Sequence, residues 1–130
     1  MEKFPHFIFA VQEKYNQYQN PYHNYEHGIN VLHATYLFIK TTKVMEHLDE
    51  FDNLCLLFSA LMHDINHTGK TNGFEENSFS NLAIQYNDIS VNMSSIIIHL
   101  SKVLESHHVA TTFKMLRKKR LNVFHRLSYQ

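Results

Sequence analysis

Apolar residues recur at intervals of three and four positions along most of the chain, whereas strict alternation of apolar and polar residues is scarce. The first pattern is typical of amphipathic helices and the second of strands. Only three glycines and two prolines interrupt the 130 residues. We therefore predict an all-α fold in which helices are joined by short polar loops. The predicted helices cover residues 4–18, 24–41, 49–62, 74–86 and 103–116, and residues 66–73 form a loop.

The periodic apolar residues of each predicted helix should form its inward face, because residues three and four positions apart lie on one side of a helix. In the first helix these residues are Phe7, Ile8, Val11 and Tyr15. In the next three they are Ile29, Leu32, Tyr36 and Ile39, then Leu54, Leu57, Phe58 and Leu61, and then Phe79, Leu82, Ala83 and Tyr86. Cys55, the single cysteine, lies in an apolar run and is expected to be buried.

Charge and hydropathy argue against two classes of partner. Lysine plus arginine and aspartate plus glutamate both number 12, so the formal net charge is zero with neutral histidine. This balance gives no electrostatic basis for binding a nucleic acid polymer or an anionic membrane. No stretch approaches the roughly 18 apolar residues that a membrane span requires. A single cysteine cannot form an internal disulfide, and together these features predict a cytoplasmic protein.

Histidine is unusually frequent, with 11 residues. His23 and His27 are four positions apart near the start of a predicted helix and can therefore point to one side. His63 and Asp64 are adjacent and together offer a nitrogen and a carboxylate. Imidazole suits zinc, and a carboxylate can bridge zinc to a harder magnesium or manganese ion. We predict a site for two divalent metals, although any one of these histidines alone would more often be a structural residue.

The residues around these donors form a longer motif. Tyr22-His23-Asn24 is followed by His27, then by His63-Asp64 with His67 and Gly69, and then by Asn72 and Phe74. In order and spacing these residues resemble the signature of class I cyclic-nucleotide phosphodiesterases, and the segments 86–88, 104–108 and 122–124 resemble that family's next motifs. The resemblance covers nearly the whole chain. It implies a helical bundle of the HD type, of which these residues are the N-terminal portion, incomplete at the C-terminal end.

The resemblance also implies which residues bind metal. His27, His63 and Asp64 would be the ligands, and Asp64 would bridge the two ions. Zinc is expected at the first site and magnesium or manganese at the second. His67 and Glu105 would hold metal-bound waters through hydrogen bonds instead of binding the ions themselves.

The activity implied by the resemblance is hydrolysis of 3′,5′-cyclic nucleotides, cAMP or cGMP or both, to nucleoside 5′-monophosphates in signal transduction. Hydroxide held between the two metals would attack the cyclic phosphate. His23 would act as the general acid that protonates the leaving 3′ oxygen. Tyr22 and Asn72 would belong to the substrate pocket.

Two features depart from the family pattern. Residues 91–102 separate Ser90 from Val103, where the family motifs follow each other almost at once, so we predict an insertion there. The family's catalytic domain continues with a further aspartate ligand and with the glutamine and phenylalanine that hold the purine, and none of these follows position 130. We therefore expect exposed apolar helix faces and self-association through them.

Two other interpretations compete with the phosphodiesterase. A different His-Asp metal phosphohydrolase would explain His63 and Asp64, but not the segments 22–24 and 104–108. A catalytically incomplete remnant that binds metal or a partner protein would explain the insertion and the missing ligand. The second alternative differs from an enzyme in one observable property, which is metal binding without turnover.

Overall fold

The computed structural model describes residues 3–90, 103–125 and 127, and within them every regular element is helical. The predicted all-α fold is therefore confirmed. The six α-helices are α1 (Lys3–Tyr15), α2 (Tyr25–Thr41), α3 (Glu50–Met62), α4 (Asn72–Asn77), α5 (Asn81–Ser90) and α6 (Val103–Leu116). Two short 3-10 helices, η1 (Asn16–Tyr18) and η2 (Lys43–Glu46), follow α1 and α2. The predicted insertion at 91–102 lies outside the described residues.

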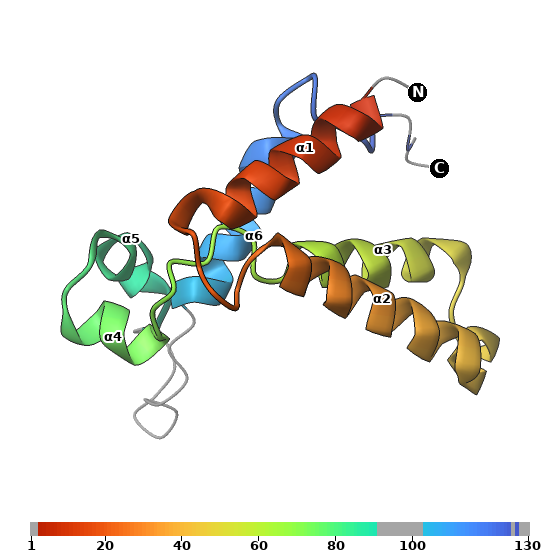
Figure 1. Ribbon diagram of the computed structural model, residues 1–130, viewed down its shortest axis with the longest axis horizontal. Helices are drawn as coiled ribbons and strands as arrows, with labels where there is room; N and C mark the ends of the chain where they lie inside the picture. Colours follow the sequence, from red (N-terminus) through yellow and green to blue (C-terminus); the bar gives the residue numbers. More distant parts are fainter. Residues whose placement is uncertain (1–2, 91–102, 126, 128–130) are drawn as a thin grey trace.

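The helices α2 and α3 run side by side and extend away from the other four (Figure 1). The helix α1 lies over the region where α6 ends, and α4 and α5 pack near the beginning of α6 (Figure 1). The start of α2 and the end of α3 meet at the centre of this arrangement (Figure 1). This junction brings the two histidine clusters of the sequence together.

Side-chain caps define where the helices begin. The side chain of Asn24 accepts a hydrogen bond from the backbone N–H of His27 and so fixes the first turn of α2. The helix α3 starts with a reciprocal capping box between Asp49 and Asp52. The hydroxyl of Thr71 caps α4 by accepting from the backbone of Phe74. The cap at Asn24 matters most for the site, because it orients the turn that carries His27.

The hydrophobic core lies where α1, the end of α3 and α6 meet. Its most buried side chains are Phe7, Val11, Tyr15, Leu61, Met62, Ile65 and Met115. Tyr15 and Ile65 have no exposed surface. Since Leu61, Met62 and Ile65 flank His63 and Asp64 in the sequence, burial of the first three anchors the segment that carries the other two.

One predicted helix is wrong. Residues 74–86 do not form a single helix, because α4 ends at Asn77 and α5 begins at Asn81. Between them Phe79 adopts a left-handed backbone with φ of 49° and is 80 % exposed, so it does not point inward. The hydroxyl of Ser80 then accepts from the backbone N–H of Ala83 and starts α5. The first predicted helix also ends early, because residues 16–18 form the 3-10 turn η1.

Burial on α2 and α3 is less than predicted. Ile29, Tyr36 and Leu54 are exposed, and so is Cys55, which was expected to be buried. The physical reason is that these helices cover each other with one face only, and the elements described do not cover the opposite faces. Further apolar side chains are exposed on the same pair of helices, namely Leu37, Phe38, Phe51 and Leu56. Self-association through these faces stays a prediction.

Among the residues that the structure describes, no helix combines the length and apolar character needed to cross a membrane.

Two glycines give a matched test of the loop between α3 and α4. Gly69 has a φ of 79°, and a side chain there would collide with Oδ1 of Asn20, whereas Gly73 lies in α4 with open space around it. We expect Gly69→Ala to lower the free energy of unfolding by at least about 1 kcal/mol. Gly73→Ala should leave stability unchanged or raise it by up to about 1 kcal/mol. Urea unfolding of both variants measures the difference, and equal losses would contradict the account of this loop.

Candidate metal centre

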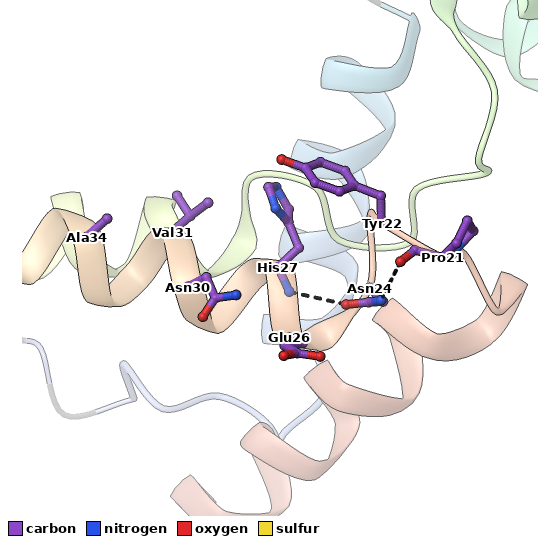
Figure 2. A pocket seen from close by; sticks show the side chains of 8 residues that line it. All are labelled: Pro21, Tyr22, Asn24, Glu26, His27, Asn30, Val31 and Ala34. Carbon is purple, nitrogen blue, oxygen red and sulfur yellow. Dashed lines mark hydrogen bonds between the residues drawn. The ribbon is translucent and has the colours of Figure 1, made fainter.

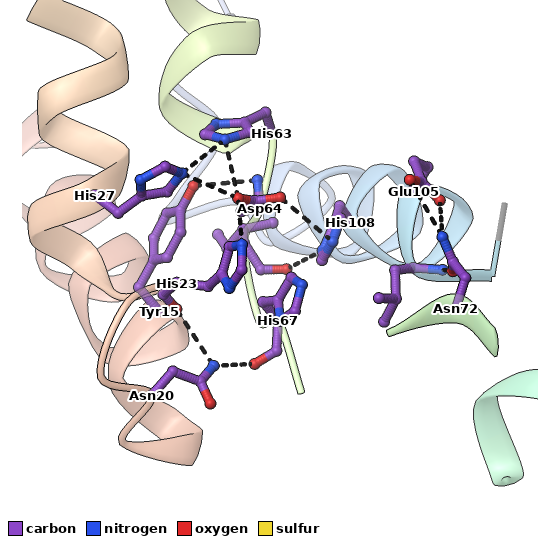
Figure 3. Close-up of polar contacts among 12 residues, drawn as sticks. Tyr15, Asn20, His23, His27, His63, Asp64, His67, Asn72, Glu105 and His108 are labelled. Carbon is purple, nitrogen blue, oxygen red and sulfur yellow. Dashed lines mark hydrogen bonds and ion pairs between the residues drawn. The ribbon is translucent and has the colours of Figure 1, made fainter. Parts of the chain in front are cut away.

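Three donor atoms converge at the junction of α2 and α3. His27 comes from the first turn of α2, and His63 and Asp64 follow the last residue of α3. Oδ2 of Asp64 lies 3.2 Å from Nε2 of His27 and 3.0 Å from Nε2 of His63. The two Nε2 atoms are themselves 3.2 Å apart. Figure 3 shows both rings turned toward the carboxylate.

This spacing fits a small divalent metal. Ligand atoms arranged tetrahedrally around zinc at 2.0–2.1 Å lie about 3.3 Å from one another. Nδ1 of His63 is 2.8 Å from the carbonyl oxygen of Ala60. A carbonyl oxygen only accepts, so Nδ1 carries a proton, and in the neutral form of His63 the lone pair of Nε2 faces the cluster. The described side chains thus present two nitrogens and one carboxylate oxygen in a geometry that a zinc ion could occupy.

A second group of possible ligands consists of Asp64, His67 and His108. Nδ1 of His67 accepts a hydrogen bond of 2.9 Å from the backbone N–H of Gly69, so neutral His67 carries its proton on Nε2. In this tautomer Nε2 donates a hydrogen bond and does not coordinate a metal. His108 has the opposite tautomer, because its Nδ1 donates to the carbonyl of Ile65 at 2.8 Å. Its Nε2 lies 3.8 Å from Oδ1 of Asp64.

His23 lies beside the cluster and not within it. Its Nε2 is 3.8 Å from Oδ2 of Asp64, and 36 % of its side chain is exposed. The ring stacks on that of His67, with centroids 4.0 Å apart and an angle of 7° between the planes. Such stacking fixes the ring orientation while leaving one side open to solvent. The ring of His23 is therefore placed where it could exchange a proton with a bound ligand.

An open groove of about 380 Å³ begins at the same junction and follows one face of α2. Tyr22, Asn24 and His27 line its beginning, and Asn30, Val31 and Ala34 line its continuation (Figure 2). The ring of Tyr22 lies 4.7 Å from that of His27 and is mostly exposed. A ligand in this groove would contact a predicted metal ligand at one end.

Asn72 and Glu105 form a separate contact to one side of His108 (Figure 3). Nδ2 of Asn72 donates to Oε2 of Glu105 at 3.0 Å, and Oδ1 of Asn72 accepts from the backbone N–H of Leu104 at 2.8 Å. Asn72 therefore ties the start of α4 to the start of α6. The carboxylate of Glu105 acts on the cluster at longer range, since its charge favours protonation of His67 and His108.

Burial and charge act in opposite directions on the titratable groups. Burial raises the pKa of Asp64, but the hydrogen bond and charge of His63, with His108 and His23, lower it overall to about 2. The hydrogen bond to Asp64 raises the pKa of His63 against the effect of burial. Burial, reinforced by His23, lowers the pKa of His67 to about 4, and burial likewise lowers the pKa of His108. His67 and His108 are therefore neutral at physiological pH, while Asp64 is ionised.

His108 and Asn20 were not predicted from the sequence to belong to the site. His108 is only 4 % exposed and faces Asp64 from α6. Asn20 donates from Nδ2 to the backbone carbonyl of His67 at 2.7 Å, which joins the loop before α2 to the loop after α3. The pair His107-His108 was a visible signal, but only tertiary packing reveals which ring turns toward residue 64.

The shifted pKa values predict how the metal-free protein responds to acid. Folded His67, with a pKa of about 4, binds fewer protons than the unfolded chain between pH 6.5 and 4. The free energy of unfolding should therefore fall as pH drops through this range, by up to about 3 kcal/mol from His67. His108 adds to the fall. His63, whose pKa is raised, gains its stabilising effect above pH 6.5 and adds little slope within this range. Asp64 should contribute a further loss only below about pH 4.

Urea unfolding at several pH values in the presence of a chelator measures this dependence. His67→Gln should flatten the slope between pH 6.5 and 4. Stability that stays constant or increases on acidification of the unmodified chain would contradict the assigned electrostatics.

Comparison with known proteins identifies relatives of this chain. Residues 22–130 match the family model described as 3′5′-cyclic nucleotide phosphodiesterase. The chain is 36 % identical over 118 residues to dual specificity calcium/calmodulin-dependent 3′,5′-cyclic nucleotide phosphodiesterase 1B of Bos taurus. It is 35 % identical over 128 residues to 3′,5′-cyclic-nucleotide phosphodiesterase regA of Dictyostelium discoideum. The alignments cover 91 % and 98 % of this chain, but only 20 % and 14 % of those relatives.

A solved structure agrees with the sequence comparison. The phosphodiesterase domain of the RhoPDE fusion protein from the choanoflagellate Salpingoeca rosetta is 38 % identical and superposes with a TM-score of 0.81. That match covers 98 % of this chain and 35 % of the solved chain. With a family model that spans most of its length and relatives of this similarity, the chain belongs to the 3′,5′-cyclic nucleotide phosphodiesterase family.

Proposed function

We propose that this chain supplies the metal ligands and the general acid of an enzyme that hydrolyses 3′,5′-cyclic nucleotides. The observation that carries the proposal is the convergence of His27, His63 and Asp64 within 3.2 Å of one another. Membership of the phosphodiesterase family supports the reaction class and disfavours other His-Asp phosphohydrolases. A cytoplasmic location is part of the proposal, on the sequence grounds given above.

The names of the relatives support a class of substrate. A high affinity cAMP-specific phosphodiesterase 8A from Mus musculus is 39 % identical to this chain, and a dual specificity phosphodiesterase 1B is 36 % identical. Relatives with different specificities therefore match these residues about equally well. We propose cAMP, cGMP or both as substrates, and this part of the sequence favours neither.

The metal ligands suggest which ions bind. His27 and His63 offer imidazole nitrogens beside Oδ2 of Asp64, which suits zinc. Oδ1 of Asp64 remains for a second, harder ion, and we propose magnesium or manganese there. Bound together, two such ions would lower the pKa of water and neutralise negative charge on phosphoryl oxygens. The low pKa of Asp64 keeps its carboxylate available for both roles.

His23 is proposed to protonate the 3′ oxygen as it leaves the phosphorus. An alkoxide is a poor leaving group, and a positioned acid contributes typically 100-fold to 10,000-fold to the rate. Nε2 of His23 lies 3.8 Å from Oδ2 of Asp64, and stacking on His67 holds the ring in place. His67, with its proton on Nε2, is proposed to donate a hydrogen bond that orients water at the centre.

The remaining predicted residues are proposed to shape the pocket. Tyr22 offers an exposed ring beside His27, at the beginning of the groove on α2. Asn72 holds Glu105 and the first turn of α6, so its effect on substrate would be indirect. Glu105 is proposed to accept a hydrogen bond from water at the centre.

Metal titration tests the proposed centre. We expect zinc and manganese to bind the purified chain stoichiometrically, and His63→Ala and Asp64→Ala each to weaken zinc binding by at least tenfold. His33→Ala, at an exposed position on the same helix as His27, serves as the control and should bind zinc normally. Equilibrium dialysis with metal analysis measures binding while cAMP and cGMP hydrolysis is followed in parallel.

The outcomes separate the alternatives. Metal-dependent hydrolysis that both substitutions remove would support the enzyme. Stoichiometric binding without turnover would favour the catalytically incomplete remnant, and no binding would exclude the metal centre.

A substitution of His23 tests the general acid separately. His23→Gln should reduce turnover of cAMP or cGMP by about 100-fold to 10,000-fold, with zinc affinity changed less than about threefold. An analogue with sulfur at the 3′ leaving position needs little protonation, so the same substitution should slow it far less. Equal slowing of both substrates would show that His23 does not act as the acid.

A further inference from the structure

We infer that Tyr15 is a positioning residue for the metal centre, because its hydroxyl holds the backbone on both sides of His63. The hydroxyl donates to the carbonyl oxygen of Leu61 at 2.9 Å and accepts from the backbone N–H of Asp64 at 3.3 Å. These contacts join α1 to a segment 46 and 49 positions away in the sequence. The inference rests on the proposed metal centre and assigns a role to a residue outside its ligand set. Figure 3 shows the hydroxyl of Tyr15 beside Asp64.

The contacts fall where α3 stops being regular. In a continuing helix the carbonyl of Leu61 would accept from the N–H of Ile65 four residues on. Here the N–H of Ile65 bonds instead to the carbonyl of Met62 at 3.2 Å. The phenolic hydroxyl thus provides the carbonyl of Leu61 with a partner. It also accepts a hydrogen bond from the N–H of Asp64. Because the side chain of Asp64 is attached to this backbone, fixing the N–H helps to fix the position of the carboxylate.

Tyr15 is a rigid support for these bonds. It has no exposed surface and belongs to the core cluster with Phe7, Val11 and Leu61. A buried aromatic ring with two side-chain torsions has little freedom to move its hydroxyl. A shift of this hydroxyl would therefore be transmitted to the backbone of Asp64 and not absorbed by the ring.

Gly28 connects the same ring to the other ligand-bearing helix. A side chain at Gly28 would place its Cβ 2.9 Å from Cζ of Tyr15 and 3.1 Å from the hydroxyl oxygen. Gly28 is buried and directly follows His27 in α2. The start of α2 can therefore approach the phenol only because residue 28 has no side chain. Tyr15 is in this way the common contact of the helix that carries His27 and the segment that carries Asp64.

Substitution of the hydroxyl alone tests the inference. Tyr15→Phe keeps the ring and removes both hydrogen bonds, so we expect affinity for zinc and cobalt(II) to fall about 10-fold to 100-fold. The visible absorption of bound cobalt(II), which depends on ligand geometry, should change in band position or intensity. Tyr25→Phe is the matched control, because Tyr25 packs near Tyr15 with rings 6.5 Å apart and lacks those two bonds. It should keep the affinity and spectrum of the unmodified chain.

A second variant approaches the same contact from the other side. Gly28→Ala keeps the hydroxyl but pushes against it, so it should also change the cobalt(II) spectrum in band position or intensity. Far-ultraviolet circular dichroism establishes that each variant retains its helices, so that loss of metal binding is not confused with loss of the fold.

The results distinguish this inference from the proposed function. An unmodified chain that binds cobalt(II), together with a folded Tyr15→Phe variant of equal affinity and identical spectrum, would overturn the positioning role alone. A lower unfolding free energy with an unchanged spectrum would likewise reduce Tyr15 to a core residue. An unmodified chain that binds no cobalt(II) would overturn the metal centre and this inference with it.

Discussion

A single carboxylate, that of Asp64, has to be held in one place while histidine rings approach it from different helices. His27 and His63 lie within 3.2 Å of one of its oxygens, and His23 and His108 lie at 3.8 Å. An anion that is partly removed from water needs such polar neighbours, because burial alone would favour its neutral form. These polar neighbours come from three parts of the fold: His27 from α2, His63 from the segment after α3, and His108 from α6.

Hydrogen bonds between side chains and the backbone hold the segments around Asp64, in addition to the apolar packing of Leu61, Met62 and Ile65. Asn66 and Gly69 adopt left-handed backbone conformations, which turn the chain sharply after the ligands. Asn20 ties the carbonyl of His67 to the loop that leads into α2. The hydroxyl of Tyr15, at the end of α1, donates to the carbonyl of Leu61 and accepts from the N–H of Asp64. The contacts of Asn20 with His67 and of Tyr15 with Leu61 are buried, so each would be costly to leave unmade.

The sequence predicted the fold class well because helical periodicity is a local pattern. Helical periodicity located α2, α3 and α6. The sequence also grouped His27, His63 and Asp64 as metal ligands, and the structure brings these side chains together, while their binding of metal stays a prediction. The break at Phe79 was missed, because a left-handed residue without glycine gives little signal in a sequence. The exposure of Ile29 and Cys55, and the roles of His108 and Tyr15, depend on which helices pack together, which periodicity does not specify.

The central claim is that His27, His63 and Asp64 together bind a metal ion. X-ray absorption at the zinc edge of the zinc-loaded chain tests it most directly. The account predicts a shell of nitrogen and oxygen atoms at about 2.0–2.1 Å with the scattering of two imidazole rings. A zinc–sulfur distance of about 2.3 Å, which would place the ion at Cys55, or a shell without two imidazoles would contradict it.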